Sequence, residues 1–360
     1  MSQDRKRIVI AAGGTAGHVV PALAVAEALR ADGAEVAFIG GRRAEARLVP
    51  AAGFPLHPIA VEGLSRSNPL RAALALARAA VAVPRARRIL KRLAPDAVMG
   101  GGGYVSGPAA LAALTLRVPV VLTEADSHMG LSNRLLAPFA RRVCLAIPLA
   151  SRRRRLGASR YRVTGRPTFA PPHERDGARA RLGIAPEETC VLVFGGSLGA
   201  RSINIAALDA FAGASFRVLH VCGPRDYPEL SRRELRAGYE LRALLDPAEF
   251  SDALVASDLV VARAGGSVAE IAARGLPAIL IPYPHATGDH QSANARWMTD
   301  AGAAIAIADG ELNATRLAGE TAALLADRPR LRAMAAAAGG LARPHAARDV
   351  ARELLEAAGP

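Results

Sequence analysis

The sequence predicts an α/β protein with two doubly wound parallel sheets, each covered by helices on both faces. Short apolar runs rich in Val, Ile and Leu alternate with Ala- and Leu-rich stretches of helical length along the whole chain. These runs are apolar throughout and do not alternate with polar residues, as expected of strands buried on both faces. The chain has 360 residues, more than the roughly 100 to 200 of one ordinary domain, so we expect two domains.

Nine strands are expected, five in the first half and four in the second. The first five are RIVIAA (7–12), EVAFIG (35–40), DAVMG (96–100), VPVVLT (118–123) and RVCLAI (142–147). The other four are CVLVFGG (190–196), FRVLHVCG (216–223), DLVVARAGG (258–266) and PAILIP (277–282). Helical stretches between consecutive strands favour parallel pairing, because parallel strands need a long crossover connection.

The domain junction is expected within GRPTFAPPHERDG (165–177), where prolines and a charge cluster interrupt the pattern. We therefore predict one domain over residues 1–165 and a second over 166–360. A closing helix is expected in AARDVARELLEAAG (346–359), and the sequence leaves open which domain it covers.

The charge of the chain is distributed unevenly between these two parts. Residues 1–165 hold 25 Lys and Arg against 9 Asp and Glu, whereas residues 166–360 hold 21 against 23. A basic half suits phosphorylated substrates, an anionic membrane or nucleic acid. Aromatic residues make up only 4% of the chain, which disfavours stacking on single-stranded nucleic acid, and no nucleic-acid partner is expected.

Targeting and redox signals are weak in this sequence. The amino terminus MSQDRKR lacks the apolar core of a signal peptide, and no window approaches the roughly 18 apolar residues of a membrane span. We expect the chain to remain in the cytosol. The three cysteines, Cys144, Cys190 and Cys222, form no CxxC pair and are expected to be buried, inert thiols.

Four glycine-rich turns follow expected strands, at residues 13–17, 100–103, 195–199 and 265–267. A glycine turn between strand and helix lets backbone N–H groups approach an anion at the positive end of the helix. A single such turn is equally consistent with a tight strand-to-helix connection. Four in a chain with a basic half favour phosphate, and ligands of open parallel sheets bind at the carboxyl ends of the strands.

Two common nucleotide motifs are absent. None of the turns reads GxGxxG, and the second strand ends in IGGRR where a dinucleotide-binding domain has an acidic residue, which disfavours a dehydrogenase. GxxxxGK[ST] is also absent, so P-loop hydrolysis has no support.

Five stretches in collinear order closely resemble the MurG-type glycosyltransferases. They are GGTAGHVVPALAVAEAL, GGGYVSGPAALAA, GGSLGARSIN, ARAGGSVAEIAARGLPAILIPYP and DHQSANA. The resemblance implies two facing Rossmann-like domains, the GT-B architecture. It also implies transfer of N-acetylglucosamine from UDP-GlcNAc to undecaprenyl-pyrophosphoryl-MurNAc-pentapeptide (lipid I), which gives lipid II in peptidoglycan synthesis. The expected partners are UDP-GlcNAc, lipid I, the anionic inner membrane surface and other cell-wall synthesis proteins, with the chain peripheral on the cytoplasmic face.

The resemblance also assigns site residues. Glu270 matches the residue that binds the ribose hydroxyls, Gln291 and Asn133 match amides near the donor sugar, and Ser197 matches a contact to the UDP diphosphate. The residues implied for UDP-GlcNAc are Thr15, Ala16, Gly17, Asn133, Arg166, Ser197, Leu245, Gly265, Gly266, Ser267, Val268, Ala269, Glu270 and Gln291. Those implied for the acceptor are Gly13, Gly14, Gly102, Gly103, Tyr104, Ser106 and Glu124. The alternative for Glu270 is a first-turn residue that favours the helix dipole, and for Gln291 and Asn133 ordinary helix-surface residues.

The acceptor hydroxyl needs a base, because its pKa lies far above 7. His18 is the leading candidate, since it follows Gly17 at a helix start that favours neutral imidazole. The alternative is that His18 only hydrogen-bonds substrate or backbone.

No DxD triplet and no clustered His, Asp or Glu at ligand spacing occurs in the sequence. We therefore expect no metal and no cofactor, with backbone amides stabilising the departing UDP. An α-linked donor attacked once gives an inverted, β-linked product, and no pair of carboxylates for double displacement is evident.

Three positions depart from the family pattern. HEQN appears as Thr123 to Asp126, in which only Glu124 matches, and Asp126 could act as a second base or be solvated. GNPVR appears as GRPTF, so the last Arg is missing and Arg166 is a candidate replacement for its charge. Ala16 stands where Gly is common.

A basic stripe is expected on one helix in the first half. Arg71, Arg78, Arg85 and Arg92 recur every seven residues with Arg88 between the last two, and SRRRRLG (151–157) adds a second basic run. Such a stripe is often a solvated face, but a lipid-linked acceptor favours docking on an anionic leaflet.

Two other functions remain open for this sequence: a UDP-GlcNAc 2-epimerase of the same architecture, and a non-catalytic nucleotide-sugar-binding subunit.

Overall fold

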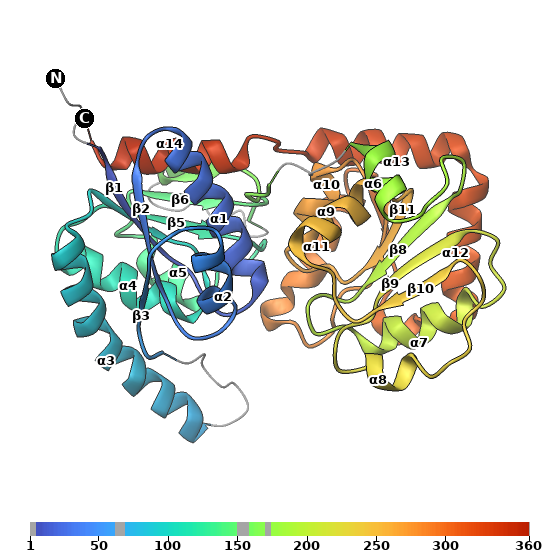
Figure 1. Cartoon of the computed structure of the whole chain (residues 1–360), viewed down its shortest axis with the longest axis horizontal. Coiled ribbons are helices and arrows are strands. Elements are labelled where there is room, and N and C mark those ends of the chain that lie inside the picture. The colour runs from blue at the N-terminus through green and yellow to red at the C-terminus, as the bar shows by residue number, and fades with distance from the viewer. Residues whose placement is uncertain (1–4, 62–68, 150–157, 170–173, 360) are drawn as a thin grey trace. The chain divides into compact units, whose positions relative to one another are not determined.

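The structure, a computed structural model, describes residues 5–61, 69–149, 158–169 and 174–359, with the side chains of 69–80 outside this description. It divides the chain into two compact units (Figure 1). The first unit is Met1–Phe169 with His345–Pro360, and the second is Ala170–Pro344. The sequence places the boundary after residue 165 and assigns the closing helix to no domain; in the structure the boundary follows Phe169, and the closing helix belongs to the first unit.

The first unit is built on a parallel sheet of seven strands in the order β3-β2-β1-β4-β5-β6-β7. The strands are β1 (Arg7–Ala11), β2 (Glu35–Gly40), β3 (Leu56–Pro58), β4 (Ala97–Gly100), β5 (Val120–Glu124), β6 (Arg142–Leu145) and β7 (Tyr161–Val163). The connecting helices are α1 (Ala16–Ala31), α2 (Ala44–Ala51), α3 (Pro69–Leu93), α4 (Gly103–Thr115) and α5 (Leu131–Leu136), with the 3-10 turn η1 (Ala158–Arg160) before β7.

Strand β1 shows why these runs are apolar throughout. Ile8 and Ile10 pack into the core on one face of the sheet, together with residues of α1. Val9 and Ala11 point to the other face and pack with residues of α3 and α4. Both faces are buried from Ile8 to Ala11, so these positions are apolar, whereas Arg7 at the exposed start of the strand is charged.

The closing helix α14 (Ala346–Ala357) covers the first sheet beside α1 (Figure 1). Its buried residues Val350 and Leu354 join the core that contains Ile8 and Ile10. Glu353, 8% exposed, accepts a hydrogen bond of 2.8 Å from Arg142 Nε at the start of β6, and Arg162 Nε lies 3.7 Å from the same carboxylate. Apolar burial and an ion pair therefore both fix the chain terminus on the first unit.

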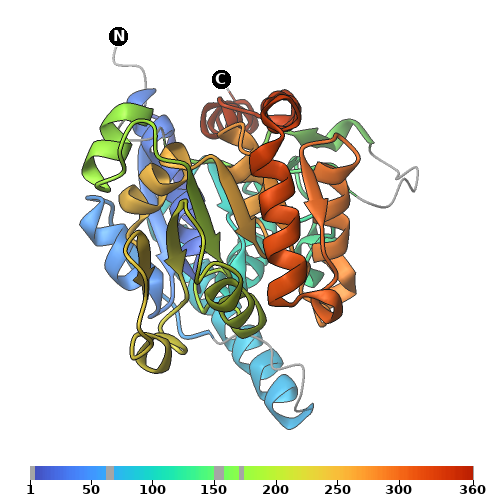
Figure 2. The same ribbon diagram turned by 90° about the vertical axis from the view of Figure 1, so that its right-hand side faces the viewer.

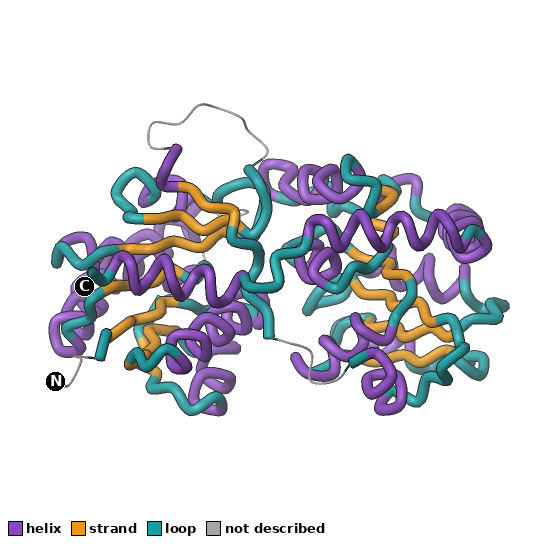
Figure 3. The backbone as a smooth tube through the Cα atoms, turned by 90° about the horizontal axis from the view of Figure 1, so that it is seen from above, coloured by secondary structure: helices purple, strands orange, loops and turns teal. Residues whose placement is uncertain are grey.

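The second unit is built on a parallel sheet of six strands in the order β10-β9-β8-β11-β12-β13. Helices lie on both sides of the strands in each unit (Figures 2 and 3). The strands are β8 (Cys190–Phe194), β9 (Arg217–Val221), β10 (Tyr239–Arg242), β11 (Leu259–Ala262), β12 (Ala278–Leu280) and β13 (Ala304–Ala306). The helices are α6 (Arg175–Arg181), α7 (Arg201–Ala210), α8 (Tyr227–Leu230), α9 (Pro247–Ala256), α10 (Ser267–Ala273), α11 (His290–Thr299), α12 (Ala314–Ala326) and α13 (Arg328–Leu341), with 3-10 turns η2 (Thr287–Asp289) and η3 (Asp309–Glu311).

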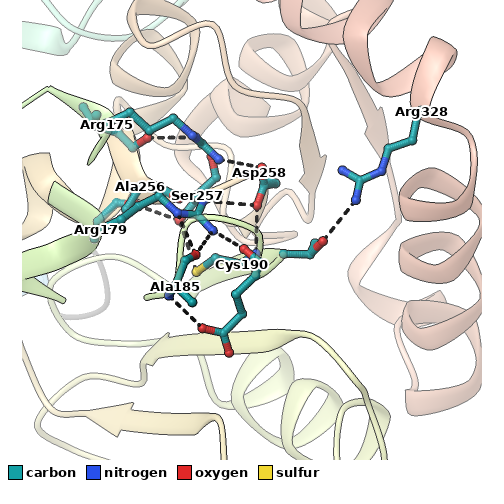
Figure 4. Close-up of polar contacts among 12 residues, drawn as sticks. Arg175, Arg179, Ala185, Cys190, Ala256, Ser257, Asp258 and Arg328 are labelled. Atoms are coloured by element: carbon teal, nitrogen blue, oxygen red, sulfur yellow. Dashed lines mark hydrogen bonds and ion pairs between the residues drawn. The ribbon is translucent and has the colours of Figure 1, made fainter. Parts of the chain in front are cut away.

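Two arginines of α6 anchor the beginning of the second unit (Figure 4). Arg175 donates to the carbonyl oxygens of Val255 and Ser257 and to Asp258 Oδ1 at 2.6 Å. Arg179, 3% exposed, donates to the carbonyls of Ala185 and Ala256 at 2.9 Å each. The carbonyls of residues 255–257 lie at the end of α9 and lack helical partners, and cations are favoured at a helix C-terminus.

The three cysteines are free and buried, as the sequence predicts. Burial raises the pKa of the Cys144 thiol to about 12 and that of Cys190 to about 11. Both thiols are therefore protonated and unreactive at neutral pH.

Candidate active site

Three loops meet at the carboxyl edge of the first sheet, after β1, β2 and β4, which are neighbours in it. The loop after β1 leads into α1, where Thr15 is the N-cap with extended backbone. Among the described residues, no acceptor is found for the N–H groups of Ala16 and Gly17. Open amides at the start of a 16-residue helix are the arrangement that can bind an anion, and the anion site expected at residues 13–17 stays a prediction.

The glycines let these loops approach one another. A Cβ at Gly103, whose φ is +75°, would lie 1.9 Å from the carbonyl oxygen of Gly13. A Cβ at Gly102, with φ +89°, would lie 2.6 Å from Cδ2 of His18. Close approach of the two loops therefore requires glycine, and the structure brings Gly13, Gly102, Gly103 and His18 together.

A buried carboxylate that the sequence analysis missed ties the three loops together. Glu45, in α2, is fully buried and accepts hydrogen bonds from Gly14 N–H (2.9 Å), Gly41 N–H (2.8 Å) and the Tyr104 hydroxyl (2.8 Å). Burial alone would raise the pKa of Glu45, but these donors outweigh it and hold that pKa below its usual range. Burial and the contact with Glu45 raise the pKa of Tyr104 to about 12, so Tyr104 keeps its proton and donates it. The only sequence signal for Glu45 was an acidic residue shortly after Gly40 and Gly41.

His18 lies half-buried in the first turn of α1, with Nδ1 3.4 Å from the Thr15 hydroxyl. Burial lowers the pKa of His18, and the nearby Arg166 guanidinium lowers it further, while Asp126 and Glu45 act in the opposite direction. The imidazole is therefore neutral at neutral pH, the state that a general base requires.

Arg166 follows β7 and belongs to the first unit. It is 8% exposed and donates from one Nη to the carbonyl oxygen of Gly17 at 2.7 Å. The sequence analysis assigned Arg166 to the UDP-GlcNAc site; in the structure its guanidinium supports the loop that carries His18.

A second carboxylate, that of the half-buried Glu124, stands at the end of β5. Glu124 accepts hydrogen bonds from Gly130 N–H at 2.8 Å and from Asn133 Nδ2 at 3.0 Å. Burial raises the pKa of Glu124 despite these donors. Asn133, 6% exposed, also donates to the carbonyl of Thr123 at 2.8 Å, so both described bonds of the Asn133 amide lie within its own loop. Ser106 lies buried in α4.

In the second unit, the turn after β8 approaches the turn after β9. A Cβ at Gly199, with φ +75°, would lie 1.9 Å from the carbonyl of Cys222, so glycine is required there. Ser197 in the same turn is exposed. Leu245 is half-buried in the loop before α9, directly ahead of the capping residue Asp246, whose side chain accepts from the N–H groups of Ala248 and Glu249.

The turn after β11 leads into α10, where Gly265, Gly266 and Ser267 precede the half-buried Glu270. The side chains of Val268 and Ala269 are buried inside the unit, so only their backbones are open to a ligand. Gln291 lies beside this turn, because a Cβ at Gly265 would lie 3.8 Å from its Nε2. The Oε1 atom of Gln291 accepts from Tyr283 N–H at 2.9 Å, which directs the amide donors of Gln291 away from Tyr283.

A second residue that the sequence analysis did not single out supports this edge. Arg263, 9% exposed at the end of β11, donates to Asp309 Oδ1 at 2.6 Å and to the Ser202 hydroxyl at 2.8 Å. Its guanidinium also lies 5.4 Å from the centre of the Tyr283 ring. The buried Arg263 therefore packs against Tyr283, the residue whose N–H orients Gln291.

Metal-binding clusters and membrane-spanning helices are both absent from the residues that the structure describes. Within them, no three His, Cys, Asp or Glu side chains come close enough together to hold a metal ion. None of the helices in this part of the chain combines the length and the apolar composition of a membrane span.

Comparison with known proteins identifies both halves of the chain. Residues 8–145 match the model of the glycosyltransferase family 28 N-terminal domain, and residues 190–354 match that of its C-terminal domain. A curated protein of Moorella thermoacetica is 41% identical, with 97% of this chain and 98% of that protein covered. A protein of Methylococcus capsulatus is 43% identical, with 98% and 99% covered.

Both curated proteins are named UDP-N-acetylglucosamine–N-acetylmuramyl-(pentapeptide) pyrophosphoryl-undecaprenol N-acetylglucosamine transferase. Among solved structures, the crystal structure of Acinetobacter baumannii MurG superposes with a TM-score of 0.73 at 29% identity and covers 98% of this chain and 99% of its own. The two parallel-sheet units and these matches agree with the predicted GT-B architecture. The chain belongs to glycosyltransferase family 28.

Proposed function

We propose that this chain transfers N-acetylglucosamine from UDP-GlcNAc to lipid I, the undecaprenyl-pyrophosphoryl-MurNAc-pentapeptide, and so makes lipid II. The observation that carries the proposal is the similarity, over nearly the whole chain, to relatives named for this transfer. The anion-binding turns support it, because donor and acceptor are both diphosphate esters.

The two units would divide the substrates between them. The second unit would bind UDP-GlcNAc, with Ser197 and the turn 265–267 at the diphosphate, Glu270 accepting the two ribose hydroxyls, and Gln291 donating to the sugar. The resemblance implied Ala16 and Gly17 for UDP-GlcNAc. Because their N–H groups are open in the first unit, at the start of the helix that carries His18, they would instead receive the acceptor diphosphate.

His18 would act as the general base. As the acceptor sugar hydroxyl attacks the anomeric carbon, its proton passes to His18 and the bond between that carbon and the UDP oxygen breaks. Thr15 lies next to Nδ1, which leaves Nε2 for the proton. Attack opposite the α-linked UDP inverts the configuration, and backbone amides stabilise the charge on the departing diphosphate without a metal ion.

The first unit would also dock on the cytoplasmic face of the membrane. A cavity of about 600 Å³ beside the end of α3 is lined by His57, Pro58, Arg85, Arg88, Ile89, Lys91 and Arg92. Arg85, Arg88 and Arg92 belong to the predicted basic stripe, and Lys91 adds a cation that the stripe did not include. The side chains of Arg71 and Arg78 and the run 151–157 lie outside the described residues. On and after α5, the apolar residues Leu131, Leu135 and Phe139 are 50%, 62% and 71% exposed and follow one another at four-residue spacing. Cations for lipid headgroups and apolar side chains for the acyl boundary are what an interfacial surface needs.

The decisive experiment uses the purified chain with labelled UDP-GlcNAc and a lipid I analogue. Label should pass to the lipid, and UDP should be released only when the acceptor is present. Release or epimerisation of the donor without acceptor would indicate a 2-epimerase. Donor binding with no turnover would indicate a non-catalytic subunit.

The same assay in EDTA tests whether the transfer is independent of metal ions. Activity should persist in EDTA, and a loss of activity that magnesium restores would contradict metal independence.

A further inference from the structure

We infer that Arg43 is a ligand for the acceptor diphosphate, held in place by the ring of Tyr104. The inference rests on the proposed function and deepens it, because it names the cation that would meet this diphosphate. Neither the sequence motifs nor the family resemblance pointed to Arg43.

Glu45 and Tyr104 form a rigid platform beneath Arg43. Tyr104 lies in the first turn of α4, and its hydroxyl reaches Glu45 in α2, past Gly14 in the loop after β1. A Cβ at Gly14 would lie 3.4 Å from Cε1 of Tyr104, so the ring covers this glycine. The ring is therefore fixed by a hydrogen bond at one end and by packing along its length.

Arg43 lies on this platform. Its guanidinium carbon is 5.4 Å from the centre of the Tyr104 ring, within range of a cation–π interaction. Arg43 is the N-cap residue of α2 and is exposed. Within the described part of the chain, its guanidinium makes no hydrogen bond or ion pair with protein. The N–H donors of the Arg43 guanidinium are thus open to a ligand, while the Tyr104 ring fixes the position of the guanidinium.

The electrostatics of the loop require such a cation. Glu45 is a buried anion directly behind Gly14, and it takes the Gly14 N–H that the sequence analysis assigned to the acceptor. The Glu45 carboxylate would repel a diphosphate bound at this loop and so disfavour it. A guanidinium at the rim offsets this repulsion and offers a planar fork that matches two phosphate oxygens.

Kinetics of Arg43→Ala test the inference, with Arg42→Ala as the matched control. Arg42 is the preceding residue and is also exposed; its backbone interacts with the Tyr104 hydroxyl, but no contact of its side chain with Tyr104 is described, so Arg42→Ala leaves the Tyr104 contacts in place. A soluble lipid I analogue in vesicle-free buffer removes any contribution of membrane phosphates. We expect Arg43→Ala to raise the acceptor KM about tenfold, as for loss of a charge-assisted contact, with the UDP-GlcNAc KM and kcat within about twofold of wild type. Arg42→Ala should change all three by less than about twofold.

Direct titration with inorganic pyrophosphate, in saturating UDP to fill the donor site, should show about tenfold weaker binding to Arg43→Ala than to Arg42→Ala. Equal acceptor KM values for the two variants, or a rise confined to the UDP-GlcNAc KM, would overturn the inference and leave the transferase function standing. A wild-type chain that transfers no sugar to lipid I would overturn both. Thermal unfolding of Arg43→Ala should match wild type, since the side chain is exposed.

Discussion

The buried Glu45 and the half-buried Glu124 lie at the same edge of the first sheet, yet their pKa values move in opposite directions. Donors from three loops hold the pKa of Glu45 below its usual range, whereas burial prevails at Glu124 and raises its pKa. Glu124 also accepts donors, from Ala125, Asp126 and Gly130 N–H and from the Asn133 amide, but burial and the neighbouring Asp126 charge raise its pKa against them. At Glu45, two N–H groups and a phenol from separate elements outweigh burial. Glu45 thus links elements as an anion, a role that depends on its charge.

Replacing Glu45 should therefore destabilise the first unit. Glu45→Ala leaves two buried N–H groups and the Tyr104 hydroxyl without their acceptor, and we expect a loss of about 3 kcal/mol in urea unfolding. Glu45→Gln should cost about 2 kcal/mol, because an amide offers one acceptor oxygen where the carboxylate offers two. The exposed Glu35→Gln, in the same unit, should stay within about 0.5 kcal/mol of wild type.

The effect of Glu45 should depend on pH. Because folding lowers its pKa, its stabilisation is complete above the unfolded value of about 4.3 and disappears as the pH falls through the folded-state value. The stability difference between wild type and Glu45→Gln should therefore shrink below about pH 4. A difference that stays constant down to acid pH would show that Glu45 is not bound as an anion.

Charges around His18 should move the acid limb of the pH–rate profile. Burial and Arg166 lower the pKa of His18 and Asp126 raises it, so the wild-type limb should lie below the ordinary value of about 6.5. Removing a cation with Arg166→Gln should shift the limb to higher pH, and removing an anion with Asp126→Asn should shift it to lower pH. His18→Ala should remove the limb and most of kcat. Profiles that coincide in all four proteins would exclude His18 as the base.

Much of this site could be predicted from local patterns, and the rest required tertiary structure. The glycine turns and His18 were found because a turn between strand and helix leaves a short signature. Glu45 and Arg263 were missed because their roles depend on partners 59 and 46 residues away, Tyr104 and Asp309. A Glu in the first turn of a helix, or an Arg after a strand, is common on surfaces and signals nothing alone.

At the scale of elements, all nine strands expected from the sequence are present, and four more were missed. These are β3, β7, β10 and β13, the outermost strands of the two sheets. Each has only three or four residues, and β7 and β10 carry exposed polar positions. An edge strand is buried less than an inner one, so it does not need the continuous apolar run that reveals the inner strands.

The closing helix α14 should be part of the stability of the first unit, although 175 residues of the second unit precede it. Leu354 is fully buried in the core with Ile8 and Ile10, so Leu354→Ala should cost about 3 kcal/mol. The exposed Arg352→Ala, on the same helix, is the control and should cost less than about 0.5 kcal/mol.

The chain carries its own reporter for this experiment. Its single tryptophan, Trp297, lies in α11 of the second unit. Leu354→Ala should accelerate amide exchange in β1. The urea unfolding of the second unit, followed by Trp297 fluorescence, should keep its wild-type midpoint. If Trp297 and β1 respond equally, α14 stabilises both units together.

At the scale of the whole molecule, the two units differ in charge. The first unit has 28 Lys and Arg against 12 Asp and Glu, an excess of 16 positive charges, whereas the second has 18 against 20. Excess positive charge on one unit favours the approach of that unit to an anionic surface over the approach of the neutral one. This asymmetry is readable from the sequence, but the cavity beside α3 and the exposed apolar residues near α5 needed the structure.

Membrane binding should therefore have a salt-sensitive and a salt-insensitive component, each with its own residues. Replacing Arg85, Arg88 and Arg92 by Gln should weaken binding to vesicles with anionic lipid about a hundredfold at low salt, since each Arg near the surface contributes about 1 kcal/mol. The effect should vanish in about 1 M salt, where the screening length falls to about 3 Å.

Leu135→Ser with Phe139→Ser should weaken binding equally at both salt concentrations, because burial of apolar side chains at the acyl boundary is not screened. The exposed cations Arg330, Arg332 and Arg343 of the second unit, replaced by Gln, match the charge change of the first variant and should leave binding unchanged. If this control binds as weakly as the Arg85, Arg88 and Arg92 variant, net charge governs association and no docking face exists on the first unit.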